Sequence, residues 1–154
     1  LSRIALHART GKQQYKGHPD LEAFQGFYEL CQHPLYYNGG IESLSDIRQI
    51  LIRFPLLKGV FIGRGLLSSP LLAKEFKGNE TFLPEQRMSI YFAFHEELFS
   101  AYSQVLQGET QLLVKMKTLW EYFLPETDRK LLKRIKKSTR LQQYTESVKA
   151  IFTS

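Results

Sequence analysis

The 154-residue sequence contains one cysteine, Cys31, and no apolar run near the ~20 residues that a membrane-spanning helix needs. A single cysteine excludes an intrachain disulfide and a cysteine-rich zinc site, and it agrees with a reducing compartment. The N-terminus also lacks the charged and then apolar pattern of a secretory signal. We therefore expect a soluble, cytoplasmic protein without a structural metal.

Acidic residues are outnumbered, because 21 lysines and arginines face 15 aspartates and glutamates and leave a net charge of +6. This excess favours a polyanionic partner. Residues 128–140 hold seven basic residues against the single acid Asp128, so this stretch alone carries seven minus one, or +6, and the rest is balanced. The basic residues are Arg129, Lys130, Lys133, Arg134, Lys136, Lys137 and Arg140.

The pattern along the chain predicts an α/β part followed by an all-α part. Residues 1–78 alternate short β-rich runs with amphipathic helical stretches, which is typical of βα units in a parallel sheet. We expect strands at 3–7, 35–37 and 59–62, with helices from Asp20, from Ser43 and over about 70–76. After Gly78 no convincing strand follows, and helices are expected at about 84–106, 109–122, 127–138 and 141–152.

Two glycine turns follow the second and third predicted strands. Asn38-Gly39-Gly40 and Gly63-Arg64-Gly65 each come directly after a strand and directly before a helix. Glycine lets backbone N–H groups approach an anion, and Arg64 could add a charge-assisted hydrogen bond. In (β/α) barrels the loops after the last two strands are a recurrent phosphate site. Ordinary tight βα turns are the alternative for either turn alone; together they favour phosphate.

His7, Arg9 and Thr10 lie at the end of the first predicted strand, where a barrel places functional side chains. The imidazole could hydrogen-bond a cofactor, and Arg9 could meet a polyanion. The alternative is a histidine satisfied inside the fold and an arginine on a solvated loop, and chemistry alone ranks that alternative first.

The order and spacing of these motifs resemble the tRNA-dihydrouridine synthase family. The similarity is strong from Ile4 to about Leu72 and continues weakly through residues 115–122. Its motifs are Leu6-His7-Ala8-Arg9-Thr10, Gln14-Tyr15-Lys16-Gly17, Tyr37-Asn38-Gly39-Gly40-Ile41 and Gly59-Val60-Phe61-Ile62-Gly63-Arg64-Gly65.

The resemblance implies an FMN-dependent (β/α)8 barrel with an appended helical domain, which reduces the C5–C6 bond of a uracil in tRNA using NADPH. Residues 1–78 would be the last three βα units and residues 79–154 the helical tRNA-binding domain. By carry-over His7 contacts the flavin, Arg9 faces flavin or RNA, and the FMN phosphate is held by Asn38, Gly39, Gly63 and Arg64. Many members have Asp where this chain has Gly40. Gly40 still offers a backbone N–H to the phosphate, but any capping role of the Asp carboxylate is lost.

The family's catalytic cysteine and its flavin-contacting lysine have no counterpart here, so no catalytic residue is expected in this chain. Cys31 sits between apolar neighbours and is interpreted as a small buried thiol. The five preceding strands of a barrel are also absent. Three parallel strands cannot close a barrel, so we expect negligible turnover and self-association through exposed barrel edges.

The basic stretch and residues 115–122 predict RNA contact. The cations of residues 129–140 spread around a helix that keeps one apolar side, and Lys115, Lys117, Trp120 and Tyr122 add basic and aromatic groups. The alternative is a solvated charged face with Trp120 in the core. For the whole chain, two other functions stay open: another FMN-dependent barrel oxidoreductase, or a non-catalytic RNA-binding module.

Overall fold

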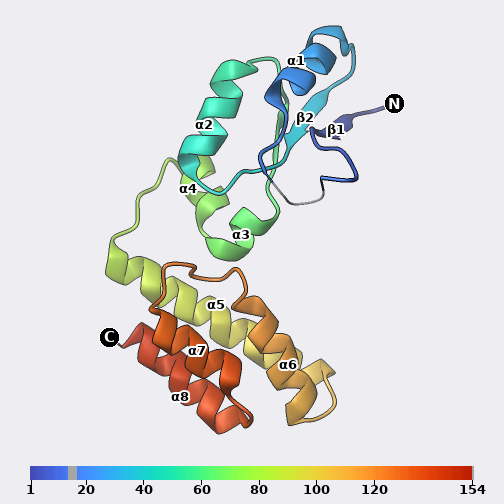
Figure 1. The fold of residues 1–154 in the computed structure, drawn as a ribbon. Coiled ribbons are helices and arrows are strands. Elements are labelled where there is room, and N and C mark those ends of the chain that lie inside the picture. Colours follow the sequence, from blue (N-terminus) through green and yellow to red (C-terminus); the bar gives the residue numbers. More distant parts are fainter. Residues whose placement is uncertain (14–16, 154) are drawn as a thin grey trace. The chain divides into compact units, whose positions relative to one another are not determined.

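The computed structural model describes residues 1–13 and 17–153, which form three strands and eight helices. The chain divides into two compact units, Leu1–Gly78 and Asn79–Ser154. All three strands belong to the first unit, and the second contains helices and loops but no strand among its described residues (Figure 1). No helix in the described part of the chain combines the length and apolarity needed to cross a bilayer.

The first unit is built on a parallel sheet in the order β1-β2-β3. Its strands are β1 (Ile4–His7), β2 (Leu35–Asn38) and β3 (Gly59–Phe61). The register pairs His7 with Asn38 and Asn38 with Phe61, so the three strands end level with one another. The loops that follow the strands therefore begin along one edge of the sheet.

Capping side chains begin the two helices that connect the strands. Asp20 accepts hydrogen bonds from the backbone N–H groups of the first turn of α1 (Leu21–Leu30). Ser43 and Asp46 form a reciprocal capping box at the start of α2 (Leu44–Arg53). Each cap satisfies N–H groups that have no partner inside the helix, which is why the predicted starts of both helices are correct.

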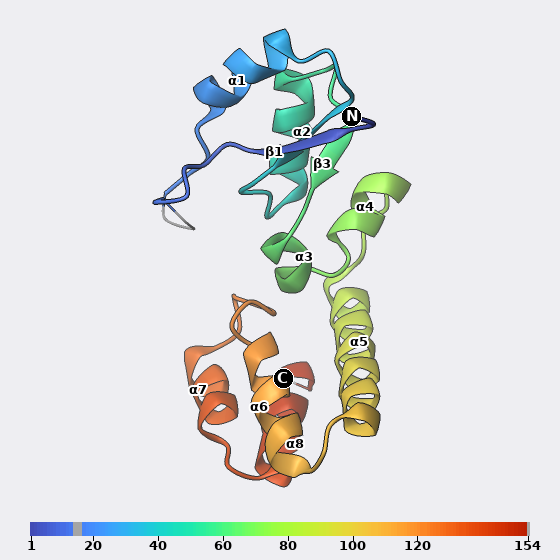
Figure 2. The ribbon, with the colours of Figure 1, turned by 90° about the vertical axis from the view of Figure 1, so that its right-hand side faces the viewer.

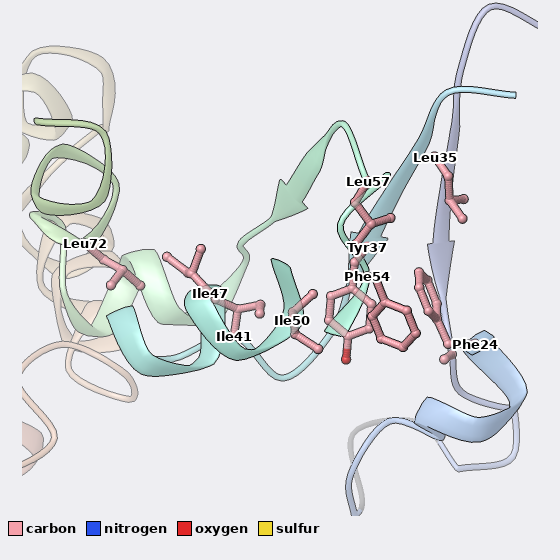
Figure 3. Packing of buried hydrophobic residues seen from close by; sticks show 10 residues of the cluster. Phe24, Leu35, Tyr37, Ile41, Ile47, Ile50, Phe54, Leu57 and Leu72 are labelled. Carbon is pink, nitrogen blue, oxygen red and sulfur yellow. The ribbon is translucent and has the colours of Figure 1, made fainter. Parts of the chain in front are cut away.

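An aromatic cluster between these helices and the sheet forms the core of the first unit. The ring of Phe24 meets those of Tyr37 and Phe54 edge to face, both with centroids 4.9 Å apart (Figure 3). All three side chains are buried. Because strand side chains alternate between faces, burial of Leu35 and Tyr37 on this side places Asn38 on the opposite face of β2.

The segment after β3 differs from the prediction of one short helix over residues 70–76. It forms α3 (Arg64–Ser68), which begins at the second glycine turn, and then α4 (Leu72–Gly78) (Figure 2). The break falls just before Pro70, because a proline disfavours helical backbone in the preceding residue. The helix after β3 thus starts six residues earlier than expected.

The second unit contains α5 (Pro84–Val105), α6 (Glu109–Leu119), α7 (Arg129–Lys137) and α8 (Leu141–Phe152). Helix α8 contacts each of the other three. Helix α7 starts two residues later than predicted because Asp128 accepts from the N–H groups of Lys130 and Leu131 and acts as its N-cap. Helix α6 ends at Leu119, three residues before the predicted end.

A buried hydrogen-bond chain joins α5, α8 and the end of α6. The indole Nε1 of Trp120 donates to the hydroxyl of Tyr144 at 2.9 Å, and that hydroxyl lies 2.7 Å from Nε2 of His95. Since an indole can only donate, the Tyr144 hydroxyl gives its own proton to His95, whose Nδ1 then donates to Glu96. This direction requires a neutral His95, and burial lowers the pKa of that imidazole although Glu96 opposes the shift.

Candidate phosphate pocket and basic groove

A pocket of about 230 Å³ lies where the strands of the first unit end. Both glycine turns line it, together with His7 at the end of β1. Six of the seven residues predicted to hold the cofactor line this pocket, namely His7, Asn38, Gly39, Gly40, Gly63 and Arg64. It is also lined by Ile41, Glu42, Phe61 and Gly65.

The first turn requires glycine at positions 39 and 40, because of the backbone conformation there and the closeness of neighbouring side chains. Gly39 has φ +133° and Gly40 has φ +63°, both in the left-handed region that favours glycine. A Cβ on Gly39 would lie 2.7 Å from Cδ2 and 3.0 Å from Nε2 of His7. The His7 ring therefore rests on bare backbone, and the ends of β1 and β2 are in direct contact.

The second turn packs on the chain that follows the first. A Cβ on Gly65 would collide with the carbonyl oxygen of Ile41 and lie 3.1 Å from the Cα of Glu42. Gly63 is different, because a Cβ there would meet nothing within 4 Å. Gly65 thus serves the packing of the two turns, while Gly63 exposes backbone on a pocket that it lines.

The prediction that the first turn lies directly before a helix is wrong. Asn38-Gly39-Gly40 does not lead directly into a helix, because α2 begins at Leu44. The carboxylate of Asp46 accepts hydrogen bonds from the N–H groups of Glu42 at 3.0 Å and Ser43 at 2.8 Å. These helix-initiating amides are already engaged, so an anion would meet the glycine turn itself rather than α2.

The pocket carries charges of both signs. Arg64 is half-buried, and the carboxylate-bearing Glu42 is exposed. Sequence interpretation missed Glu42 and Phe61. Only the strand register, which pairs Phe61 with Asn38 at the ends of adjacent strands, places Phe61 at the pocket.

Arg9 is separated from the phosphate pocket. It lines a second pocket of about 330 Å³ with Asp20, Phe24 and Phe27. His7 is the residue that lines both pockets among those predicted for the cofactor. The positive charge of Arg9 acts on Tyr37, whose pKa burial raises and Arg9 lowers.

Gln14, Tyr15 and Lys16 lie outside the described residues. Cys31 was interpreted as a small buried thiol, but it is only half-buried. It is the C-cap of α1, and its Sγ donates to the carbonyl oxygen of His33 at 3.5 Å.

The cations of the basic stretch fall into two groups on the second unit. All seven side chains are exposed. Four of them line a groove of about 420 Å³ between α7 and α8, namely Lys130, Lys133, Arg134 and Lys137. The other three, Arg129, Lys136 and Arg140, are not among the groove's lining residues. Ser138, Gln143, Glu146 and Ser147 complete the lining.

The two lysines of α6 and Trp120, the C-cap of that helix, have structural partners. Lys117 Nζ donates to the carbonyl oxygen of Ser138 at 2.7 Å, and Lys115 Nζ lies 5.3 Å from the ring centroid of Tyr102. Trp120 is 2% exposed and therefore cannot stack on an RNA base in this structure. The core interpretation of Trp120 is correct, while Tyr122 is 36% exposed.

A parallel sheet whose strand ends bring two glycine turns around one pocket defines an α/β protein with a candidate anion site. The family model described as "Dihydrouridine synthase (Dus)" matches residues 1–153, and the chain belongs to this family, whose fold is a (β/α)8 barrel. This confirms the resemblance inferred from the motifs.

Two curated relatives carry the name "Probable tRNA-dihydrouridine synthase". The protein of Aquifex aeolicus (strain VF5) is 34% identical over 77 residues, which are 50% of this chain and 24% of the relative. That of Rhizobium leguminosarum bv. phaseoli is 36% identical over 67 residues, which are 44% of this chain and 21% of the relative. The matched regions thus span less than a quarter of each relative's length.

Proposed function

We propose that this chain supplies the FMN phosphate site and the RNA-contacting helices of a tRNA-dihydrouridine synthase. The enzyme reduces uridine in tRNA to 5,6-dihydrouridine with NADPH in the cytoplasm. Residues 1–78 are the last three βα units of its barrel, and residues 79–154 are its helical tRNA-binding domain. The proposal is carried by the meeting of both glycine turns with His7 and Arg64 around one pocket, in a chain of the dihydrouridine synthase family.

The residues of the pocket fit a phosphate monoester. The bare backbone of Gly63 allows a phosphate to approach closely, and the guanidinium of Arg64 suits two phosphate oxygens at once. Glu42 opposes an anion, but its exposure to solvent weakens that repulsion. The balance favours a phosphate whose charge lies on the Arg64 side of the pocket.

Each predicted residue then has a role. Asn38, Gly39, Gly40, Gly63 and Arg64 hold the FMN phosphate, and His7 contacts the flavin. Arg9, in its separate pocket, faces the flavin ring or the RNA. When bound, the flavin supplies the reducing equivalents for the C5–C6 bond, and the target uracil must leave its stack to reach it. The residue that protonates the uracil lies outside this chain, so the chain alone has negligible turnover.

The phosphate role is tested by comparing FMN with riboflavin, which lacks the phosphate. Flavin fluorescence is titrated with the chain, and FMN should bind more tightly by about tenfold or more, the value of one charge-assisted hydrogen bond. Arg64→Gln should remove most of this preference, while Arg48→Gln on the exposed side of α2 should not. Equal affinities for FMN and riboflavin in the unchanged chain would contradict the proposal.

The RNA role is assigned to the basic residues of the second unit. They are Lys115, Lys117, Arg129, Lys130, Lys133, Arg134, Lys136, Lys137 and Arg140. Lys117 acts through the Ser138 carbonyl and thus supports the end of α7, whereas the exposed cations of α7 attract RNA phosphates. A gel shift with a tRNA transcript tests this role, and absence of a shift at low salt would contradict it.

A further inference from the structure

The cations that line the α7/α8 groove form one stripe along α7. Lys130, Lys133, Arg134 and Lys137 follow the spacing i, i+3, i+4, i+7, which places them on one helical face. Seven residues of helix rise about 10 Å. One strand of a B-form duplex presents about three phosphates over that length. The stripe therefore has the length of a short run of phosphates.

Helix stability does not explain this stripe. Like charges at these spacings destabilise a helix by about 0.2–0.5 kcal/mol per pair. The helix dipole favours Arg134 and Lys137 in the last turn, but it disfavours Lys130 in the first. Within the part of the chain that the structure describes, none of the four forms an ion pair with an acidic side chain. An external anion is the partner that this arrangement lacks.

The opposite wall of the groove differs in charge. Helix α8 contributes Gln143 and the carboxylate of Glu146. Gln142 donates to Glu146 at 3.0 Å, which holds the carboxylate on its own helix. An anionic chain in the groove would be attracted to the α7 wall and repelled from the α8 wall.

Resting on the RNA role proposed above, we propose that the phosphodiester backbone of one RNA strand lies along the α7 wall of this groove. Glu146 keeps that backbone off the α8 wall and so sets its lateral position. Lys117 is a positioning residue, because its bond to the Ser138 carbonyl fixes the end of α7 where Lys137 stands. Arg129, Lys136 and Arg140 add only general attraction.

The test compares two triple variants of equal charge in the full chain. Lys130→Gln/Lys133→Gln/Lys137→Gln removes three groove cations, and Arg129→Gln/Lys136→Gln/Arg140→Gln removes three others, so each lowers the net charge from +6 to +3. Affinity for a fluorescein-labelled tRNA transcript is measured by anisotropy across a salt series. The groove variant should flatten the log–log salt slope by about 2, from three lost contacts at ~0.7 each, and the control by less than 1.

Equal loss in both triple variants would overturn the inference and leave diffuse attraction, with RNA contact itself intact. An unchanged slope in the groove variant, with tRNA still bound, would overturn it and move the contact elsewhere. No binding by the unchanged chain would overturn both the inference and the proposed RNA role, while the FMN comparison stays a separate test. Displacement of tRNA by polyglutamate or anionic vesicles at equal charge concentration would overturn RNA as the occupant.

A gain of binding provides a second variant. Glu146→Gln should tighten tRNA binding by about two- to fivefold, because it removes repulsion at an exposed site. Glu109→Gln, at the start of α6 and outside the groove lining, is the matched control and should change affinity less. Equal gains in the two variants would overturn the role of Glu146.

Discussion

The imidazole of His7 rests on the bare backbone of Gly39, so that a Cβ at Gly39 would come within 2.7 Å of the ring. This contact joins the ends of β1 and β2, two segments separated by the whole of α1. It means that the flavin-contacting residue and the first phosphate turn of the proposed site are positioned together. A substitution at either residue should therefore alter the position of the other.

Gly39→Ala should destabilise the first unit by about 1–3 kcal/mol, since the new methyl group overlaps the His7 ring and φ +133° is strained for alanine. Chemical denaturation measures the loss. In a His7→Ala background the steric part should disappear and the backbone part should stay. Strict additivity of the two substitutions would show that the ring and the turn are not coupled.

The two glycines that flank Arg64 should respond differently to alanine. Gly65→Ala should lower the melting temperature, because its methyl group collides with the main chain of Ile41. Gly63→Ala meets no atom within 4 Å, so it should melt close to the unchanged chain. It should nevertheless weaken FMN binding, because the methyl group occupies the proposed phosphate approach. Equal FMN affinity for Gly63→Ala and the unchanged chain would argue against that approach.

The His95 chain predicts a pH dependence of stability. The folded-state pKa of His95 lies below its ordinary 6.5, because burial disfavours the charged ring. The unfolded chain therefore binds the proton more readily. The stabilising contribution is fully present above pH 6.5 and is lost as pH falls below it toward the folded pKa. Protonation would also leave the Tyr144 hydroxyl proton without its acceptor.

Denaturation of the second unit at pH 7.5 and 5 measures this loss. Tyr144→Phe should cost about 1–3 kcal/mol at neutral pH, because Trp120 and His95 would lose a buried partner. His95→Phe tests the mechanism, since it should reduce the acid-linked part of the destabilisation. A pH dependence that is identical in His95→Phe would assign the effect to other groups.

Self-association is expected from the sheet edges. Among the described residues, β1 and β3 each pair with β2 alone, so both strands have an outer edge. Light scattering over a concentration series should show growth in mass, and Ala5→Lys on exposed β1 should reduce it by adding charge to an edge. A constant monomer mass at high concentration would contradict this expectation.

Local signals in the sequence were sufficient for much of the fold. Asp20 and Ser43 satisfy the first N–H groups of their own helices, so the starts of α1 and α2 could be read from neighbouring residues. The glycine turns were visible because a left-handed backbone at Gly39 and Gly40 favours that residue type. The segment after β3 was misread because Gly65 looked like part of a turn, whereas it lies inside α3 against Ile41.

The sequence by itself determined the alternation of strands and helices, the two turns, the family and the positive charge of residues 129–140. Only the tertiary structure decided that Arg9 lies outside the phosphate pocket and that Trp120 is buried in the core. It also decided which basic residues of α7 line the groove and which do not. Caps and turns depend on residues a few positions apart. The surroundings of a side chain depend on segments distant in sequence, and for α7 the decisive neighbour is α8.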